Sequence, residues 1–376
     1  MALLTEEQNI IRDQARAWVD EKTPVNAFRA VRDEGTGFDS ATWQEMVQLG
    51  WTGLIVPKSY GGAGLGYLTF GLVLEQLGRN LVASPLLASS LAGVAALIES
   101  GDEQHTQALL PAVVSGDAIV TLAIDEGPRH APERIGLHAR RDDTDFVLNG
   151  EKSAVPEGMA ATHFVVAARC DAAPAGLAGI TLFVVPANTP GVTRTAMALM
   201  DGRGYALVQF EGVMLDSGAV LGDSMQGGAI LRSTLDRAAA AQSAEMLGGA
   251  SRAFEMTLEY LKTRKQFGQV IGGFQALGHR AAELYSAMEL SRSCAEAALQ
   301  ALDDGAGNAE ALCALAKVKV GDFLYLMSNE LIQMHGGIGM TDEFDAGLYL
   351  KRARVQEAAF GNRSFYRNRY ADLVGF

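Results

Sequence analysis

The chain has 376 residues, of which 48% are hydrophobic and 20% are charged, and its formal net charge is −13. This length is sufficient for two or three packed domains with a large buried interior. The acidic balance argues against nucleic-acid binding, which needs lysine and arginine clustered on one face. The three cysteines, Cys170, Cys294 and Cys313, are odd in number and far apart. They predict neither a disulfide framework nor a thiolate zinc site.

The sequence also predicts where the protein works. The first residues carry charge from position six onward and lack an apolar run of signal-peptide length. No stretch of 18 consecutive apolar residues occurs, so we expect no membrane-spanning segment and no membrane partner. A cytoplasmic location is the expectation, in keeping with the sparse cysteines. None of the six histidines has metal-like spacing, so we expect no metal site.

The residue pattern changes twice along the chain, from helical to β-strand and back to helical, and predicts three domains. Residues 1–116 read as helices, with Thr5 as an N-cap and Gly50 ending a helix that begins near residue 40. Residues 117–224 are short runs rich in Val, Thr and Phe between Gly, Pro and Asp turns, which is typical of a β domain. Helical periodicity returns over 225–376, beginning with one long alanine-rich helix predicted to run as far as Gly268. The predicted class is a multidomain α+β protein.

Two segments of the last domain carry residues suited to phosphate. RKQFGQVIGGFQAL (264–277) places Arg264 at a helix end, where its guanidinium fork matches a phosphate. QMHGGIGMTDEF (333–344) has glycines that let backbone amides approach a pyrophosphate closely. Taken singly, each feature is more often a solvated helix end, a C-cap or a core aromatic. Their order and spacing together favour a binding site.

Together with GWTGLIVPKSYGGAGLG near residue 50, these segments resemble the acyl-CoA dehydrogenases, and the resemblance covers essentially the whole chain. It implies an N-terminal helical domain, a middle β-barrel or sandwich domain and a C-terminal four-helix bundle. It also implies an FAD cofactor, α,β-desaturation of an acyl-CoA thioester, and transfer of electrons to an electron-transfer flavoprotein or another acceptor.

In that family the two segments bind the adenine and pyrophosphate half of the FAD that belongs to the neighbouring subunit. The resemblance therefore implies an obligate dimer or a dimer of dimers. The cofactor-binding residues carried over to this sequence are Arg264, Gln266, Phe267, Gln275, Gln333, Gly336 and Gly337.

The family's catalytic base is missing from its usual place. The family abstracts the substrate α-proton with a glutamate, and the position that resembles it here holds Phe360. Glu357 lies three residues earlier, nearly one helical turn away. A second subgroup carries the base about 26 residues before the arginine of the first segment, which corresponds to Ala238, with Asp236 close by. We predict no catalytic residue in this chain and keep Asp236 and Glu357 as alternatives.

The middle domain also departs from the family pattern. Residues 123–135, AIDEGPRHAPERI, lack the serine and the small-residue turn that grip the flavin ring and the substrate in the family. Ala154 stands where a tryptophan is usual, and Pro156 stands where a hydroxyl is usual. Proline has no hydroxyl and no backbone N–H to donate.

These losses affect one half-site while the other stays intact, which predicts one subunit of a heteromer. The chain resembles the non-basic subunit of bacterial α2β2 acyl-CoA dehydrogenases of steroid catabolism, acting on CoA thioesters of bulky acids. A homologous glutamate-bearing subunit would bring the base. Two alternatives remain: a homomeric dehydrogenase or oxidase with a displaced base, and a non-catalytic paralogue that binds no FAD.

Overall fold

The computed structural model describes residues 3–170 and 174–376. It divides into two compact units. The helical unit comprises the chain up to Ala30, Tyr67–Val82 and Ala239–Phe376, and the sheet unit comprises Val31–Gly66 and Ala83–Ala238. Within the described residues, no helix is both long enough and apolar enough to cross a membrane.

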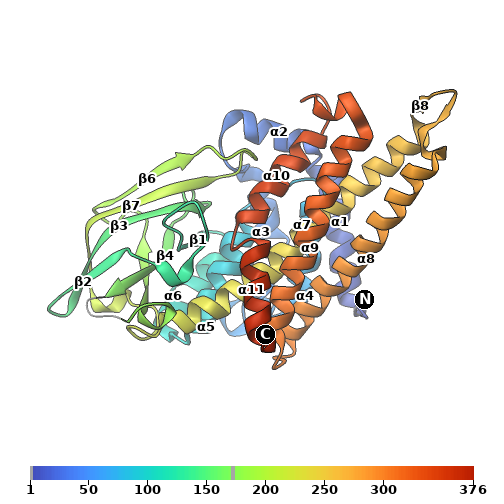
Figure 1. The fold of residues 1–376 in the computed structure, drawn as a ribbon. Helices are drawn as coiled ribbons and strands as arrows, with labels where there is room; N and C mark the ends of the chain where they lie inside the picture. Colours follow the sequence, from blue (N-terminus) through green and yellow to red (C-terminus); the bar gives the residue numbers. More distant parts are fainter. Residues whose placement is uncertain (1–2, 171–173) are drawn as a thin grey trace. The chain divides into compact units, whose positions relative to one another are not determined.

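In chain order, the α-helices form two groups, one before and one after the strands, as the sequence predicts; Figure 1 colours the chain in this order. The early α-helices are α1 (Glu6–Lys22), α2 (Val25–Glu34), α3 (Ser40–Gln48), α4 (Gly66–Arg79), α5 (Val94–Ser100) and α6 (Glu103–Val114), with a π-helix, η3 (Leu86–Gly93), before α5. The late α-helices are α7 (Gly227–Thr263), α8 (Gln275–Asp303), α9 (Ala309–His335), α10 (Ala346–Ala358) and α11 (Arg363–Val374). The boundary between the two units falls inside α7.

The predicted helix ends rest on local chemistry. Thr5 caps α1 as predicted: its hydroxyl accepts from the amide of Gln8, and the Gln8 side chain accepts in return from the Thr5 amide. Gly50 follows α3 with φ of 74°, as a C-terminal glycine does. The N-terminus of α4 is capped from another helix, because the Asp303 carboxylate accepts from the amides of Tyr67 and Leu68.

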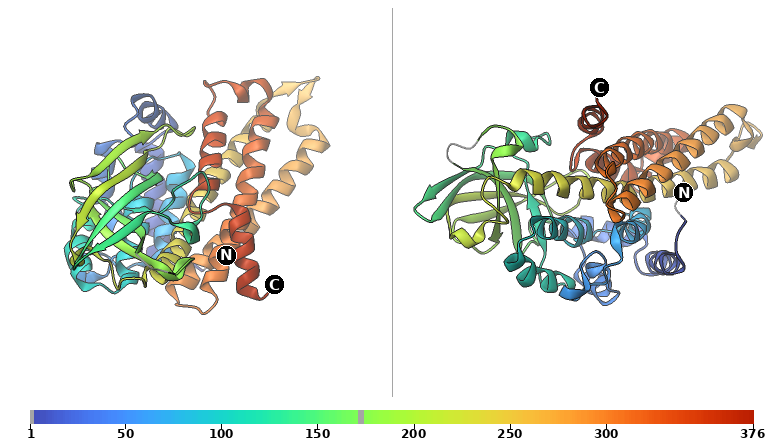
Figure 2. Two further views of the ribbon diagram at one scale, coloured as in Figure 1. Left: turned by 60° about the vertical axis from the view of Figure 1, so that its left-hand side comes forward. Right: turned by 90° about the horizontal axis from the view of Figure 1, so that it is seen from below.

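The helical unit packs through small residues. Alanines of α7, α8 and α9 form a buried cluster with Leu68 and Leu299, and Figure 2 shows α8 and α9 running side by side. α4 and α7 approach each other closely at two glycines: a Cβ on Gly248 would lie 1.8 Å from the carbonyl oxygen of Glu75, and one on Gly78 would lie 2.0 Å from that of Glu245. Only glycine fits at these positions, so the two backbones can pack in direct contact.

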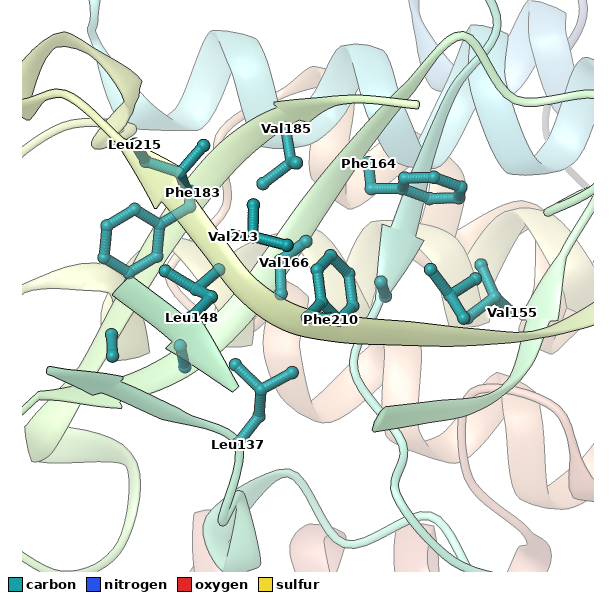
Figure 3. Close-up of a cluster of buried hydrophobic side chains, with 14 of the residues drawn as sticks. Leu137, Leu148, Val155, Phe164, Val166, Phe183, Val185, Phe210, Val213 and Leu215 are labelled. Carbon is teal, nitrogen blue, oxygen red and sulfur yellow. The ribbon is translucent and has the colours of Figure 1, made fainter. Parts of the chain in front are cut away.

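The sheet unit holds one seven-stranded mixed sheet in the order β1-β4-β2-β3-β7-β6, with β5 paired to β4. Its core contains Phe164, Phe183 and Phe210 among valines and leucines (Figure 3). The long antiparallel pair β3–β7 runs from Phe146 opposite Leu215 to Pro156 opposite Tyr205. The strands are β1 (Val120–Ala123), β2 (His138–Asp142), β3 (Asp145–Pro156), β4 (His163–Cys170), β5 (Ile180–Pro186), β6 (Val192–Met197) and β7 (Tyr205–Leu215).

One sequence prediction is wrong: the long helix does not reach Gly268. α7 ends at Thr263, and the chain then forms a short hairpin from β8 (Lys265–Gln266) and β9 (Gln269–Val270). The two turn residues, Phe267 and Gly268, have φ of 54° and 81°. Two successive positive φ values make a two-residue type I′ connection, which cannot continue a right-handed helix.

Candidate cofactor site at the end of the bundle

The two motif segments fold into loops at one end of the helical unit. The β8–β9 hairpin joins α7 to α8, and a 3₁₀ turn, η8 (Gly336–Met340), follows α9. We call these two loops, residues 264–275 and 333–340, the bundle-end site. Figure 1 shows the hairpin projecting from the tip of the α7–α8 pair.

The hairpin presents an aromatic ring on a strained backbone. Phe267 is 88% exposed, and its φ of 54° is in the left-handed region that bulky residues rarely occupy. Asparagine, aspartate or glycine is the usual residue at this turn position. Its ring has one edge-to-face neighbour within the same loop, Phe274, with ring centroids 6.2 Å apart, and otherwise faces outward. Turn propensity does not explain a phenylalanine here, and such strain is found at functional positions.

Four polar side chains of the bundle-end site have no partner in the part of the chain that the structure describes. Arg264, Gln266, Gln275 and Gln333 are exposed, and no side chain or backbone group of the described ranges pairs with their polar side-chain atoms. Most other arginines of the helical unit are engaged, for example Arg79 with Glu255 at 2.6 Å. α8 begins here as well, without a side-chain cap on its first amides. A free guanidinium beside an uncapped helix N-terminus favours an anion.

The glycine turn leaves room for a ligand against its backbone. Gly336 ends α9 with φ of 66° and ψ of −140°, a conformation that side chains disfavour. A Cβ built on Gly336 or Gly337 would meet nothing within 4 Å. Packing within the described chain therefore does not require glycine at these two positions. The missing side chains instead leave the backbone open to a group that approaches from outside.

Contacts between helices hold the two loops together. The ring of His335, the last residue of α9, stacks on the Tyr260 ring of α7 with centroids 4.3 Å apart. Arg280 of α8 forms an ion pair with Glu330 of α9. The seven residues carried over by resemblance therefore lie at the same end of the helical unit, although they are up to 73 positions apart in the sequence.

The position that resembles the family's base lies in a different turn of the helical unit. Phe360 is 8% exposed and has φ of 53°, directly after α10. The Tyr366 hydroxyl donates to the Phe360 carbonyl at 2.8 Å. The ammonium of Lys317 donates to the carbonyls of Gln356 at 3.1 Å and Ala359 at 3.0 Å. This turn is closed over an aromatic ring and offers no carboxylate.

Lys317 was not foreseen as an important residue. Its side chain is 1% exposed, and its ammonium also contacts the Gln242 amide oxygen. Burial lowers the pKa of Lys317 to about 7, although Glu245 and Glu357 favour the charged form. The only hint in the sequence is a lysine within the apolar run around 311–320.

Neither alternative base is exposed and uncommitted. Glu357 receives two short contacts from Arg363, at 2.8 Å from Nε and 2.6 Å from Nη2. Asp236 is 2% exposed and takes part in interactions within the protein. Ala238, at the second subgroup's base position, is fully buried.

In the sheet unit, the segment that departs from the family pattern, residues 123–135, forms an ion pair with strand β3. The Glu126 carboxylate accepts from Lys152 Nζ at 2.6 Å and from the amides of Gly136 and Leu137 at 2.7 and 2.8 Å. Lys152 is fully buried, and burial lowers its pKa to about 8 against the opposing charge of Glu126. The Asp125 carboxylate contacts His130 at 3.0 Å. The Glu126 and Asp125 carboxylates are therefore engaged within the sheet unit, by residues of the segment and of its neighbours.

The adjacent end of β3 is irregular. The register with β7 shifts between Lys152 and Val155, and Ala154 has φ of 49°. The Ala154 amide donates to the sulfur of Met197 at 3.2 Å. Pro156 ends the strand and has no N–H to offer.

Comparison with known proteins assigns the family. Sequence models of the acyl-CoA dehydrogenase N-terminal, middle and C-terminal domains match residues 5–117, 134–213 and 225–374. The chain belongs to the acyl-CoA dehydrogenase family. This confirms the resemblance and the predicted fold, and FAD is the cofactor of this family. Most of the altered 123–135 segment falls in the gap between the first two matches.

Individual relatives support the same assignment. Acyl-CoA dehydrogenase IpdE2 of Mycolicibacterium smegmatis is 30% identical over 359 residues, covering 95% of this chain and 96% of that protein. A variant of the Tcur3481–Tcur3483 steroid ACAD superposes with a TM-score of 0.88 at 29% identity, covering 98% of each chain. The ChsE4–ChsE5 complex of Mycobacterium tuberculosis gives a TM-score of 0.90 at 26% identity, covering 100% of this chain and 99% of that one.

The two regions differ in how they suit FAD. The bundle-end site has a free guanidinium, open glycines and an exposed ring, which fit a phosphate-bearing cofactor with an aromatic base. The sheet unit does not fit a flavin ring equally well, because Glu126 and Lys152 satisfy each other and Pro156 cannot donate. Among the described residues, the polar groups that could hold a cofactor are therefore free in the bundle-end site and engaged within the protein in the sheet unit.

Proposed function

We propose that this chain is the non-basic subunit of a heteromeric acyl-CoA dehydrogenase of α2β2 type. It contributes the adenine and pyrophosphate half of a shared FAD site, through Arg264, Gln266, Phe267, Gln275, Gln333, Gly336 and Gly337. A homologous subunit contributes the rest of the site and the glutamate base. When bound, the flavin accepts the substrate β-hydride in the α,β-desaturation.

The observation that carries the proposal is the turn at Phe360. A catalytic base must reach the substrate α-proton, and the side chain at this position is a buried phenyl ring. Lys317 and Tyr366 bind the carbonyls of the same turn, so a small register shift would cost several hydrogen bonds. Glu357 is bound by Arg363, which argues against its service as a replacement.

Within the complex, each bundle-end residue has a task that follows from its chemistry. Arg264 would hold a pyrophosphate oxygen, and the amides of Gly336 and Gly337 would approach the same group. Phe267 would pack on the adenine face, and the glutamines would bind polar edges of the cofactor. None of these residues moves a proton, in keeping with a binding role.

The substrate and setting follow from the same relatives. Two neighbours are described as a steroid ACAD and as a ChsE4–ChsE5 complex, which supports a two-component enzyme acting on CoA thioesters of bulky acids such as steroid side chains. We propose an electron-transfer flavoprotein or a similar acceptor as the redox partner and the cytoplasm as the location. We also propose functional divisions at 1–116, 117–224 and 225–376.

Expression alone and with its partner tests the proposal. A homologous glutamate-bearing subunit encoded beside this chain would be co-expressed with it. We expect the chain alone to be colourless and inactive, and the co-purified complex to be yellow and to reduce an electron acceptor with acyl-CoA. A yellow chain that turns over acyl-CoA by itself would support the homomeric alternative, with Asp236 or Glu357 as base, and would refute ours.

A single substitution then tests the shared site. In the complex, Arg264→Ala should lower the flavin content by at least about tenfold at limiting FAD, because a charge-assisted contact to the pyrophosphate is lost. Arg140→Ala, which removes an exposed arginine of β2, is the matched control and should keep the flavin. Unchanged flavin in the Arg264→Ala complex would contradict the role of the bundle-end site.

A further inference from the structure

His335 lies in the second loop of the bundle-end site, directly before the glycine turn, and its ring orientation is fixed. The residue is 4% exposed, and its Nδ1 lies 2.7 Å from the carbonyl oxygen of Leu331. A carbonyl can only accept, so Nδ1 carries the proton and donates. Burial lowers the pKa of His335, so the ring is neutral.

Aromatic rings from two directions pack on this imidazole. Tyr260 of α7 stacks on it at 4.3 Å with an interplanar angle of 29°. Phe344, beyond the glycine turn, lies 4.7 Å away at 39°. The imidazole thus contacts the chain that enters the hairpin and the chain that leaves the glycine turn.

The two stacked residues are connected through the backbone to Arg264 and Gly336, which are proposed to bind the cofactor. Gly336 follows His335 directly, so the setting of residue 335 determines where the positive-φ turn points. On the other side, the Arg264 amide donates to the Tyr260 carbonyl at 2.9 Å, which ties the start of the hairpin to the stacked tyrosine. Arg264 is therefore connected to the stacked Tyr260–His335 pair by one backbone hydrogen bond, and Gly336 is connected to it by one peptide bond.

We propose that His335 is a positioning residue for the FAD half-site: held by Leu331 and stacked on Tyr260, it sets the placement of the Gly336–Gly337 turn relative to Arg264. This inference rests on the proposed function of the bundle-end site. Nε2 of His335 is enclosed and has no partner among the described residues, so we assign the ring no contact with the cofactor. Its contribution is geometric, and it acts on affinity rather than on chemistry.

The test measures FAD dissociation from the co-expressed complex by the recovery of flavin fluorescence, together with thermal unfolding. We expect His335→Leu, which removes the stack and the Nδ1–H donor, to weaken FAD binding by about tenfold. His335→Phe keeps an aromatic ring and should weaken it by only about threefold. Leu324→Ala, a buried change three turns earlier on α9, is the stability control: it should lower the melting temperature at least as much while leaving FAD affinity within about twofold.

Variants of the partly exposed Tyr260 keep the test valid if His335 variants fold poorly. Tyr260→Phe should bind FAD like the wild type. Tyr260→Leu, which removes the stack but keeps the Nδ1–H donor of His335, should weaken FAD binding by about threefold. The double variant His335→Leu/Tyr260→Leu should bind FAD about as weakly as His335→Leu alone, because both substitutions remove the same stack.

The outcomes separate this inference from the proposed function. If Arg264→Ala releases FAD while His335→Leu and Tyr260→Leu retain it within about twofold, the half-site stands and the positioning role is overturned. If Leu324→Ala, at an equal loss of melting temperature, releases FAD as much as His335→Leu does, the effect is general destabilisation and the positioning role is also overturned. If Arg264→Ala retains FAD, the proposed function itself fails.

Discussion

Two phenylalanines of the helical unit share a backbone conformation and little else. Phe267 and Phe360 both have φ slightly above 50°, a conformation that costs a bulky residue roughly 1 kcal/mol. Phe267 is 88% exposed in a hairpin turn, whereas Phe360 is 8% exposed in a closed turn. Burial offsets the strain at Phe360, whereas the Phe267 ring has only an edge-to-face contact with Phe274 at 6.2 Å and stays 88% exposed.

This difference indicates which of the two turns is suited to bind a ligand. The Phe360 turn is complete by itself, since Lys317 and Tyr366 bind its carbonyls. The Phe267 hairpin is incomplete, with a strained exposed ring and unpaired polar groups beside it. Substitutions at the closed turn should therefore change stability, and substitutions at the open hairpin should change cofactor binding.

The largest effect is expected from Phe360→Glu, which restores the family's residue type at the base position. It should destabilise the chain by about 4 kcal/mol, because a buried ring is lost and a carboxylate enters an apolar site. Chemical denaturation measures the loss, and Phe360→Leu, which keeps an apolar side chain, should cost less than half as much. If the Phe360→Glu chain alone turned over acyl-CoA, this chain would lack only the glutamate base. It would then not need a partner subunit to complete the FAD site, which would contradict the proposed heteromer.

Lys317→Met should destabilise the chain by about 3 kcal/mol. The methionine fills a similar volume but leaves the carbonyls of Gln356 and Ala359 and the amide of Gln242 without their donor. Lys319→Met, at a half-buried position on the same helix, is the control and should change the free energy of unfolding by less than about 0.5 kcal/mol. Equal losses for both lysines would show that the closed turn does not depend on the buried ammonium.

Lys317 also predicts how stability depends on pH. Its folded pKa of about 7 is below the ordinary value of 10.5, so between these values the unfolded chain binds more protons and stability rises with pH. Below pH 7 both states are protonated, and Lys317 adds no further slope. The rise between pH 7.5 and 9.5 should be about 1–2 kcal/mol smaller in Lys317→Met, measured by urea unfolding. Lys152, with a pKa shifted in the same direction, contributes equally to both proteins, so identical slopes would argue against the buried cation.

The sequence predicted the architecture because the architecture rests on local patterns. Helical periodicity, the Thr5 cap, the Gly50 stop and the Val- and Thr-rich runs are each readable within a few residues. The motif around Arg264 was recognised through order and spacing. What it looks like in three dimensions was not, since the sequence predicted helix where Phe267 and Gly268 form a type I′ turn. A phenylalanine gives no warning of a left-handed conformation.

The remaining features depend on contacts between distant residues. Lys317 and Gln356 are 39 positions apart, and Tyr260 and His335 are 75 apart. Nothing in either local sequence distinguishes a lysine that will be buried against carbonyls from one that will be solvated. The absence of the base could be read directly, because a missing carboxylate is a matter of residue identity, but the closure of the turn around Phe360 required the structure.

The smallest effect on stability, and the sharpest contrast with Phe360, is expected from Phe267→Gly. Glycine adopts positive φ without strain, so the substitution should leave the free energy of unfolding unchanged or raise it by up to about 1 kcal/mol. In the co-expressed complex it should still lower the retained FAD severalfold, because the exposed ring is gone. Denaturation of the chain alone and flavin content of the complex measure the two effects. Phe376→Ala, which removes a ring that is 97% exposed at the C-terminus, is the control and should change neither. A destabilised Phe267→Gly chain would mean that the ring packs within its own subunit, whereas a more stable chain with less FAD would identify its strain as the cost of holding a ring for the cofactor.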